Sequence, residues 1–326
     1  MYSFSDKNQN IALIGCGYWG TIIAKTLINL KFKNIIIYDF NIKNSKTLKK
    51  KFTSLKIENN FKNILLNKSI KNVFLVIPPS QTFSLIKKCL NSKKNVFVEK
   101  PGVVKINHLK IVNQLAKKNK LKLMFGYIYY YNDHIEKINR IIKSNILGKI
   151  HYLSFQRQNL GPIRNDVDVD YDLTSHDLSI IDKFFGKLPK ILSQKKYDIL
   201  KKGISDISNL HLKLDNVFID VNNSWLSPKK IRKISIIGEN KMLLFDEMNL
   251  IEPIKIYNQY AKYPKIEQFN KKFFNLKAHV YNGSSYSVKI NSKPPLDNEI
   301  RNFLSDKENK TGFKLANKIL VFLKRI

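Results

Sequence analysis

Five short apolar runs alternate with amphipathic stretches over the first 125 residues. The runs are IALIG (11–15), NIIIYD (34–39), NVFLVI (72–77), NVFVE (95–99) and LKLMF (121–125). They are rich in β-branched and aromatic residues and almost continuously apolar, which is typical of strands covered on both faces. Helices fit between them near 19–31, 43–53, 81–91 and 106–119. This alternation predicts an α/β domain over 1–125, built on a doubly wound parallel sheet.

The pattern changes after residue 126. Helices are predicted near 134–144 and 173–185, with an extended stretch between them at 150–159. The second helix should end at Gly186, because glycine commonly follows the last helical turn. Residues 190–258 contain several strands joined by turns, which indicates a mainly antiparallel sheet. Two more helices are predicted near 296–304 and 311–324. We therefore expect an α+β domain over 126–326, with closing helices able to pack back on the first domain.

The composition excludes several classes of protein. The chain has 326 residues, of which 43% are hydrophobic, so it can bury the cores of two domains. No stretch approaches about eighteen consecutive apolar residues, and we expect no membrane partner. The polar start MYSFSDKNQN lacks the pattern of a signal peptide. Cys16 and Cys89 form no disulfide or metal pattern. We expect a cytoplasmic protein without a metal ion.

The formal net charge of +33 has two explanations. One is a nucleic-acid or membrane-surface partner. The other is a compositional bias toward Lys, Asn and Ile across the whole chain. The lysines are spread along the sequence, and the densest short run is KTLKKKF (46–52). Nucleic-acid binding requires a clustered footprint, so we favour the bias and expect no nucleic-acid partner. The positive field would still attract an anionic substrate.

The three glycines of IALIGCGYWG have the spacing Gly15-x-Gly17-x-x-Gly20. They follow a predicted strand and open a predicted helix, which is the context of a dinucleotide-binding loop. Gly15 permits a tight turn, Gly17 lets the backbone approach a pyrophosphate, and Gly20 lets helix and strand pack closely. Amide groups at the helix N-terminus would then face the phosphates. The pattern predicts a pyrophosphate cradle.

Asp39 ends the second predicted strand, nineteen residues after Gly20. An acid about 20 residues beyond the glycines binds the adenosine ribose hydroxyls in dinucleotide-binding folds. A carboxylate there would repel a 2′-phosphate, so the sequence predicts NAD as the cofactor, with NADP disfavoured. The alternative is a surface Asp in the turn after a strand.

Several ordered motifs resemble the glucose-fructose oxidoreductase/inositol dehydrogenase/rhizopine catabolism (GFO/IDH/MocA) family. They are GCGYWG (15–20), VIPPS (76–80), VEKP (98–101), YDLTSHDLSIIDKFFG (171–186) and PPLDNEIRNFL (294–304). The resemblance spans essentially the whole chain. It implies a Rossmann domain, followed by an α+β domain built on a large, mainly antiparallel open sheet. It also implies a nicotinamide-dependent oxidoreductase acting on a sugar or polyol, usually as a homodimer or homotetramer.

The resemblance also implies which residues meet the cofactor. The glycine loop would bind it together with its neighbours Tyr18 and Trp19. Pro78 and Pro79 would line it, and Glu99 and Lys100 would lie where cofactor meets substrate.

Oxidation of a secondary alcohol needs a group that takes the hydroxyl proton and a charge that steadies the developing alkoxide. Lys100 follows a predicted sheet strand at its carboxyl end, where ligands bind, and its ammonium could polarise the substrate oxygen. His176 has an Asp four residues earlier, Asp172, which shares its helix face and could raise its pKa. We assign His176 as the general base or acid. Asp172 then contacts the substrate or tunes His176; alternatively it is a helix cap beside a packed histidine.

The substrate is predicted to be a nucleotide-activated amino sugar used in surface-polysaccharide synthesis. The segment NLGPIRNDVDVDYDLTSHD (159–177) resembles family members that act on such sugars. Arg164, Arg157 and Tyr127 are the candidate substrate contacts, although each Arg could equally be an ordinary surface residue. The family departures at Tyr127 and Gly102 leave the exact sugar open. A free-sugar or inositol dehydrogenase and a non-catalytic nucleotide-binding regulator are the alternatives.

The alternating acids of NDVDVDYD (165–172) look like the start of a calcium loop. The glycine that such a loop needs is replaced by Tyr171, and its closing Glu is Asp177, so we reject a calcium site. These carboxylates could bind sugar hydroxyls or form a solvated loop.

Overall fold

The computed structural model describes residues 7–262 and 278–326. The chain divides into two compact units. Their described residues fall within Met1–Asn132, Leu178–Ile180 and Lys293–Ile326 for the first unit, and within Asp133–Asp177 and Ile181–Ser292 for the second.

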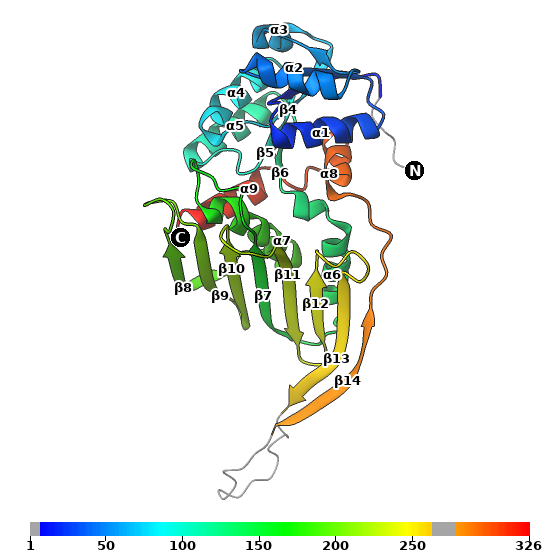
Figure 1. Ribbon diagram of the computed structural model, residues 1–326, viewed down its shortest axis with the longest axis vertical. Coiled ribbons are helices and arrows are strands. Elements are labelled where there is room, and N and C mark those ends of the chain that lie inside the picture. The colour runs from blue at the N-terminus through cyan, green and yellow to red at the C-terminus, as the bar shows by residue number, and fades with distance from the viewer. Residues whose placement is uncertain (1–6, 263–277) are drawn as a thin grey trace, which may run out of the picture. The chain divides into compact units, whose positions relative to one another are not determined.

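The first unit is built on a six-stranded parallel sheet with the order β3-β2-β1-β4-β5-β6. Figure 1 labels three of these strands, β4, β5 and β6. The strands are β1 (Asn10–Ile14), β2 (Asn34–Tyr38), β3 (Lys56–Ile57), β4 (Ile70–Leu75), β5 (Asn95–Glu99) and β6 (Leu123–Gly126). The strand order reverses between β1 and β4, and open α/β sheets bind ligands at the carboxyl ends of the strands at such a point. The predicted doubly wound parallel sheet is confirmed.

Helices connect these strands. They are α1 (Tyr18–Asn29), α2 (Ile42–Lys51), α3 (Phe61–Leu66), α4 (Pro79–Asn91) and α5 (Ile106–Lys118). The densest lysine run of the sequence falls in α2, whose last turn holds Lys49, Lys50 and Lys51. Cations at a helix C-terminus complement the partial negative charge there. This run therefore has a local structural explanation.

The two closing helices, α8 (Pro295–Phe303) and α9 (Phe313–Leu323), belong to the first unit. Helix α8 packs against α1 and against the short 3₁₀ helix η1 (Ile128–Tyr131), and α9 packs against α5 and β6. The ring of Phe303 makes edge contacts with Phe74 of β4 and Phe97 of β5. The core of the parallel sheet is therefore closed by residues from the far end of the chain.

The second unit is built on an eight-stranded sheet with the order β14-β13-β12-β11-β7-β10-β9-β8. Its described neighbouring pairs are antiparallel except for β7 and β10, which are parallel. The strands are β7 (Ile150–Gln158), β8 (Lys190–Tyr197), β9 (Ile207–Leu214), β10 (Val217–Ser224), β11 (Ile231–Gly238), β12 (Met242–Asp246), β13 (Ile254–Lys262) and β14 (His279–Ser287). The large, mainly antiparallel sheet is confirmed.

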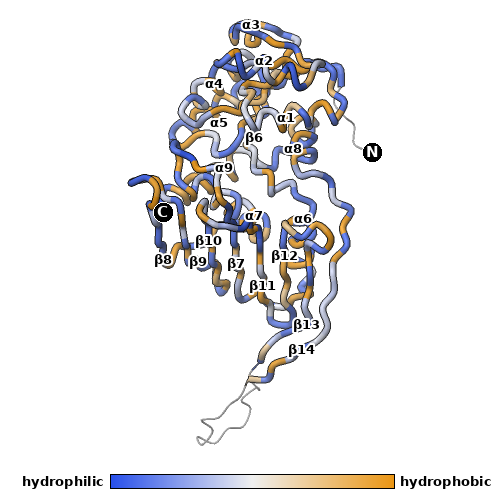
Figure 2. Tube along the Cα trace, in the orientation of Figure 1, coloured by the Kyte–Doolittle hydropathy of each residue, from blue (hydrophilic) through white to orange (hydrophobic). Residues whose placement is uncertain are grey.

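Buried and exposed residues alternate along β9 and β10, as expected of strands with one covered face. Figure 2 shows the same alternation as hydrophobic and hydrophilic colours along this sheet. The helices of this unit are α6 (Asp133–Lys143), the π-helical turn η2 (Asp170–Thr174) and α7 (Ser175–Phe185). Helix α7 ends at Gly186, whose φ of 72° is left-handed, as the sequence predicted. Its first turn, however, follows a π turn that the sequence did not predict.

Candidate active site

The glycine loop has the shape that a pyrophosphate cradle requires. Gly15 has a φ of +100°, and a Cβ there would lie 2.1 Å from the carbonyl oxygen of Val76. A Cβ on Gly20 would lie 2.0 Å from the carbonyl oxygen of Gly15, so the helix and the loop touch without side chains between them. Gly17, at the N-cap of α1, has nothing within 4 Å of its Cβ position, and no side chain caps this helix. Open space and uncapped amides together fit a bound phosphate.

Asp39 follows β2 directly, and its carboxylate is tied to the glycine loop. Its Oδ2 accepts a hydrogen bond from the Cys16 amide at 2.7 Å, and its Oδ1 accepts from the Asn41 amide at 2.8 Å. Oδ1 also accepts from the Asn44 side-chain amide at 3.2 Å. An ionised carboxylate offers about four lone-pair sites, so capacity remains for about one ribose hydroxyl. Asp39 therefore holds the loop in place and also stands where the predicted cofactor contact requires a carboxylate.

Cys16 lies between the first two glycines and is buried. Its Sγ is 3.6 Å from the carbonyl oxygen of Tyr38 and 3.7 Å from Ser45 Oγ. Burial, with a smaller contribution from the charge of Asp39, raises the pKa of this thiol to about 11. The thiol is therefore protonated at neutral pH and serves as packing beneath the loop.

Pro78 and Pro79 lie at the start of α4, just after β4, which is the strand next to β1 in the sheet. Pro78 is the N-cap of α4, with φ −56° and ψ 144°, and Pro79 is the first residue of that helix. Proline suits a first helical turn because its missing N–H would find no partner there. Both residues lie at the carboxyl end of the strand that adjoins the glycine loop in the sheet.

Glu99, the last residue of β5, is bonded to the helix that the glycine loop opens. Its Oε1 accepts a hydrogen bond of 2.5 Å from Nε1 of Trp19. In the sheet Glu99 is paired with Gly126 of β6, where a Cβ would lie 2.9 Å from Glu99 Oε2. Gly126 thus leaves the room that the carboxyl group occupies. Burial raises the pKa of Glu99 to about 7, against the opposing effects of the Trp19 hydrogen bond and the Lys100 charge.

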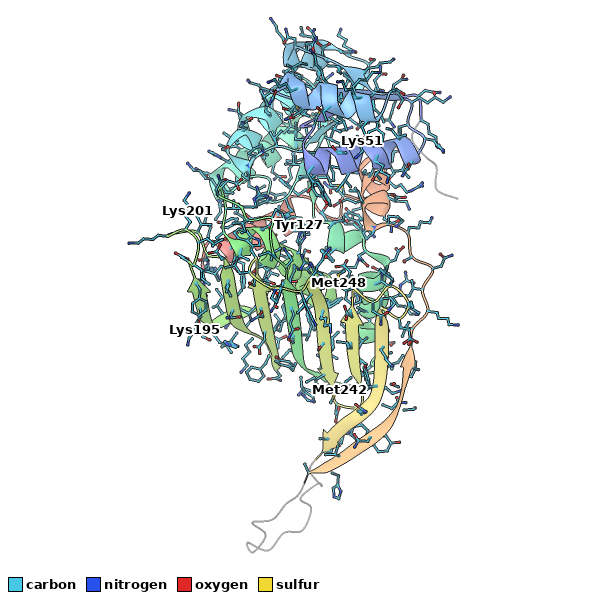
Figure 3. All side chains as sticks on the ribbon, in the orientation of Figure 1. Lys51, Tyr127, Lys195, Lys201, Met242 and Met248 are labelled. Carbon is cyan, nitrogen blue, oxygen red and sulfur yellow. The ribbon has the colours of Figure 1, made fainter. Side chains whose placement is uncertain are left out.

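The remaining predicted residues of the first unit differ in exposure. Lys100 follows Glu99, is partly exposed, and forms a cis peptide bond with Pro101. Tyr18 is 83% exposed at the start of α1. Tyr127 directly follows β6 and is labelled in Figure 3; it is only 3% exposed, and burial raises its pKa well above the usual range. Access to a small molecule is therefore greatest for Tyr18 and least for Tyr127.

Asp172 and Arg164 meet in the second unit. Asp172 lies in the π turn η2, and its Oδ2 accepts a hydrogen bond of 3.1 Å from Nε1 of the buried Trp225. Arg164 Nη1 is 4.0 Å from Asp172 Oδ1, while its Nε and Nη2 bind both carboxylate oxygens of Asp166 at 2.9 and 2.8 Å. The partly buried His176 is the second residue of α7. A π turn inside a helix is common at functional sites.

Arg157 takes a structural position instead of the substrate contact that the sequence suggested. It is 4% exposed, and its Nε and Nη2 both bind Asp177 Oδ1, at 3.1 and 2.8 Å. The guanidinium is thus committed to a buried ion pair between β7 and α7. The pair therefore ties the first turn of α7 to β7.

A buried polar network joins the π turn to the sheet. Asn223 of β10 donates to Thr174 Oγ1 at 2.8 Å and to Asp177 Oδ2 at 3.0 Å. Thr174 in turn donates to Asp170 Oδ1 at 2.6 Å, and Asp170 pairs with Lys196 of β8 at 2.9 Å. Sequence reasoning did not identify this role, because the partners lie on separate strands. Their only sequence signal was an alternation of acids that is equally typical of a solvated loop.

Lys196 also pairs with Asp168, at 3.1 Å. Its partial burial acts in the opposite direction, but the charges of Asp170 and Asp168 raise the pKa of Lys196. Each acid of 165–172 therefore lies within 4.0 Å of a cation of the protein, either Arg164 or Lys196. Among the residues that the structure describes, no group of three or more His, Cys, Asp or Glu is placed to hold a metal ion. Within the same residues, no helix has the length and apolar character needed to span a membrane.

Comparisons with known proteins agree with this geometry. Residues 9–127 match the family model GFO_IDH_MocA, described as "Oxidoreductase family, NAD-binding Rossmann fold". Myo-inositol 2-dehydrogenase of Thermotoga maritima is 26% identical over 188 residues, which cover 55% of each protein. The chain spans about half the length of the curated relatives that it matches.

Solved structures share the fold over nearly the whole chain. UDP-N-acetylglucosamine 3-dehydrogenase GnnA from Acidithiobacillus ferrooxidans superposes with a TM-score of 0.74 at 16% identity, covering 97% of this chain and 96% of that one. A variant of KijD10, a 3-ketoreductase from Actinomadura kijaniata in complex with TDP-benzene and NADP, gives 0.78 at 12% identity, with 98% and 96% covered. The glycine loop and the sheet order of the first unit agree with this match, so residues 9–127 form an NAD(P)-binding Rossmann fold of the GFO/IDH/MocA oxidoreductase type.

Proposed function

We propose that the chain is an NAD-dependent dehydrogenase that oxidises a secondary hydroxyl group of a sugar. The observation that supports this most directly is the Trp19–Glu99 hydrogen bond. It joins the helix of the phosphate cradle to the strand end that carries Lys100, so cofactor site and candidate catalytic lysine are held together within one unit. Bound NAD would accept the hydride, while the protein supplies orientation and proton transfer.

Lys100 and His176 divide the remaining chemistry in this proposal. The Lys100 ammonium polarises the substrate oxygen and steadies the alkoxide that forms as hydride leaves. His176 takes the hydroxyl proton in oxidation and returns it in reduction. Asp172, whose position is held by Trp225, contacts the substrate or tunes His176.

The cofactor choice rests on Asp39, whose negative charge disfavours a 2′-phosphate. We expect a lower KM for NAD than for NADP. Asp39→Asn keeps an oxygen that can accept from the Cys16 amide and removes the charge, so it should narrow this preference. Glu58→Gln, which removes a carboxylate just after β3, is the control and should leave the preference unchanged. An unaltered preference in Asp39→Asn would assign cofactor choice to other residues.

The substrate we favour is a nucleotide-activated amino sugar. Arg164 supports this, because its guanidinium is 30% exposed at the head of the 159–177 segment and could meet an anionic group. Myo-inositol and related free polyols are the second candidate, supported by the 26% identity to an inositol dehydrogenase. We also propose a cytoplasmic homodimer or homotetramer, which light scattering of the purified protein would test.

The deciding experiment is a substrate panel. Purified protein is mixed with NAD or NADP and with nucleotide-activated amino sugars, free sugars or myo-inositol, and reduced cofactor is followed by absorbance. Turnover with the nucleotide sugars supports the proposal, and turnover with myo-inositol alone supports the second candidate. Tight NAD binding without turnover on any compound would instead favour a nucleotide-binding regulator.

A further inference from the structure

Glu299 is a buried acid of the first unit. Glu299 of α8 is 0% exposed. Among the described residues, no hydrogen-bond donor reaches either of its carboxylate oxygens. Its neighbours along the helix, Leu296, Ile300 and Phe303, belong to the apolar core cluster. An ionised carboxylate without a cation or a donor is very costly in such surroundings, so the Glu299 side chain is neutral.

A neutral carboxylic acid is a hydrogen-bond donor, and when it is buried it needs an acceptor within the protein. Helix α8 packs against α1, which carries Trp19, and against η1, which begins two residues after Gly126. Trp19 donates to Glu99, and Gly126 is the partner of Glu99 in the sheet, so α8 packs against two segments that are linked to Glu99. Glu99 is also the charged group whose field acts on Glu299.

We propose that Glu99 and Glu299 form a carboxylate–carboxylic acid pair, in which Glu299 keeps the proton and positions the charged Glu99 beside Lys100. This rests on the proposed function, because the value of a fixed charge beside Lys100 depends on Lys100 meeting the substrate. Glu299 is a positioning residue here and touches neither cofactor nor substrate.

The charges around the pair are consistent with this distribution. Lys100 and the Trp19 indole both favour the ionised form of Glu99. Burial, together with the Glu99 charge, raises the pKa of Glu299 well above its usual value. Tyr131 of η1 also faces Glu299, and its own raised pKa keeps it neutral. On α8 the charges of Asp297 and Arg301 act on each other.

The pH dependence of the folding stability tests whether Glu299 carries the proton, and this measurement needs no substrate. When the pKa of an acid is higher in the folded than in the unfolded state, the protein loses stability as the pH rises above the unfolded-state pKa. The reason is that the acid ionises in the unfolded state and stays protonated in the folded state. Glu299→Gln is neutral at every pH. Between about pH 5.5 and about pH 7.5, the folding equilibrium constant of wild type should fall roughly tenfold per pH unit relative to that of Glu299→Gln. Glu308→Gln, at an exposed site in the same unit, should show no such trend. If the two proteins keep a constant stability difference across this range, Glu299 is already ionised in the folded state and the proposal is overturned.

Tryptophan fluorescence tests the positioning. In a Trp225→Phe background the remaining tryptophan is Trp19, whose indole is bonded to Glu99, so its emission should titrate with Glu99. Glu99→Gln should abolish the titration. With Glu299→Gln the midpoint should stay within about half a pH unit, because no charge is removed; a fall of a unit or more would place the charge on Glu299.

Glu299→Met completes the test, because it fills similar space but cannot donate. We expect Glu299→Met to shift the Trp19 titration and to lower kcat by about tenfold or more, with the amide of Glu299→Gln restoring both toward wild type. If Met and Gln behave alike in the fluorescence titration, Glu299 only fills space and the positioning role is wrong. The stability and fluorescence results stand even if no sugar substrate is found, so failure of the proposed function would be seen separately.

Discussion

Lys100 is the single side chain on which the proposed chemistry depends most. Lys100→Met keeps the stem of the side chain and removes its charge. We expect kcat to fall by about a hundredfold or more, since the alkoxide loses its stabilising cation. The NAD dissociation constant, measured by calorimetry, should change by less than about threefold. Lys110→Met, on an exposed position of α5, should leave both quantities unaltered. Near-normal turnover in Lys100→Met would remove this residue from the mechanism.

The glycines of the loop should respond differently to the same substitution. Gly17→Ala adds a methyl group to open space, so the melting temperature should change little while NAD affinity falls by about tenfold or more. Gly20→Ala pushes a methyl group onto the Gly15 carbonyl oxygen and should destabilise the unit itself by roughly 2 kcal/mol or more. Calorimetric melting and NAD titration of both variants check this. Equal loss of stability in the two would show that Gly17 is also needed for packing.

Gly102 illustrates a departure that the structure explains. Glycine stands here where the family resemblance implies a larger apolar residue, and this departure left the exact sugar open. Its φ is +70°, and a Cβ would lie 2.8 Å from the ring of Phe125. A large Phe125 ring in β6 therefore occupies the space that another side chain would need. The departure concerns packing inside the first unit, and it gives no information about the sugar.

At the scale of elements, the buried ion pair Arg157–Asp177 joins β7 to α7. Arg157→Met would leave the Asp177 carboxylate buried without its cation, so unfolding in urea should show a loss of about 3–5 kcal/mol. Lys187→Met breaks the exposed pair Lys187–Asp215 in the same unit and should cost no more than about 1 kcal/mol. A similar small loss in both variants would mean that Asp177 is satisfied by its other partners.

Lys122, immediately before β6, connects the start of this strand to the end of α8. Its Nζ donates to the carbonyl oxygens of Asn302, Ser305 and Lys307, at 2.6, 2.8 and 3.0 Å. These are carbonyls at and just beyond a helix C-terminus, which have no partner inside the helix. Lys122→Met should therefore destabilise the protein by about 1–3 kcal/mol in urea unfolding. Lys110→Met again serves as control; if it costs as much, the loss comes from removing lysine charge in general.

The elements differed in how well the sequence predicted them. The central strands of the first sheet were predictable because each is a continuous apolar run with its own boundaries. Strand β3 is only two residues, Lys56–Ile57, and carries no periodicity to detect. The π turn before α7 differs from an α-helix by one hydrogen-bond register, which hydrophobic spacing over five residues cannot resolve.

The site shows the same division between local and long-range information. The glycine loop, Asp39 and Lys100 could be proposed from the sequence because their signals lie within or just after one strand. The burial of Arg157 could not be predicted, because its partner Asp177 lies on a different element. Glu299 was missed for a related reason: an acid in an amphipathic helix reads as a solvated residue until the packing of both helix faces is known.

At the scale of the whole molecule, the net charge of +33 distinguishes the two candidate substrates. A positive field speeds the approach of an anionic nucleotide sugar, and salt screens that field over a Debye length of about 10 Å at 0.1 M. Raising the ionic strength should therefore lower kcat/KM for a nucleotide sugar several-fold. The same change should leave kcat/KM for a neutral polyol nearly constant. Equal salt dependence for both would show that the charge plays no part in substrate capture.

The packing of α8 and α9 on the first unit also constrains the order of folding during synthesis. The ribosome releases β1 to β6 long before residues 293–326 exist, and until then Phe74 and Phe97 lack the ring of Phe303 that covers them. The sheet of the first unit therefore lacks the cover of α8 and α9 while the second unit is synthesised. A nascent chain paused before residue 293 would expose this apolar surface to chaperones, and only the last helices would end that exposure.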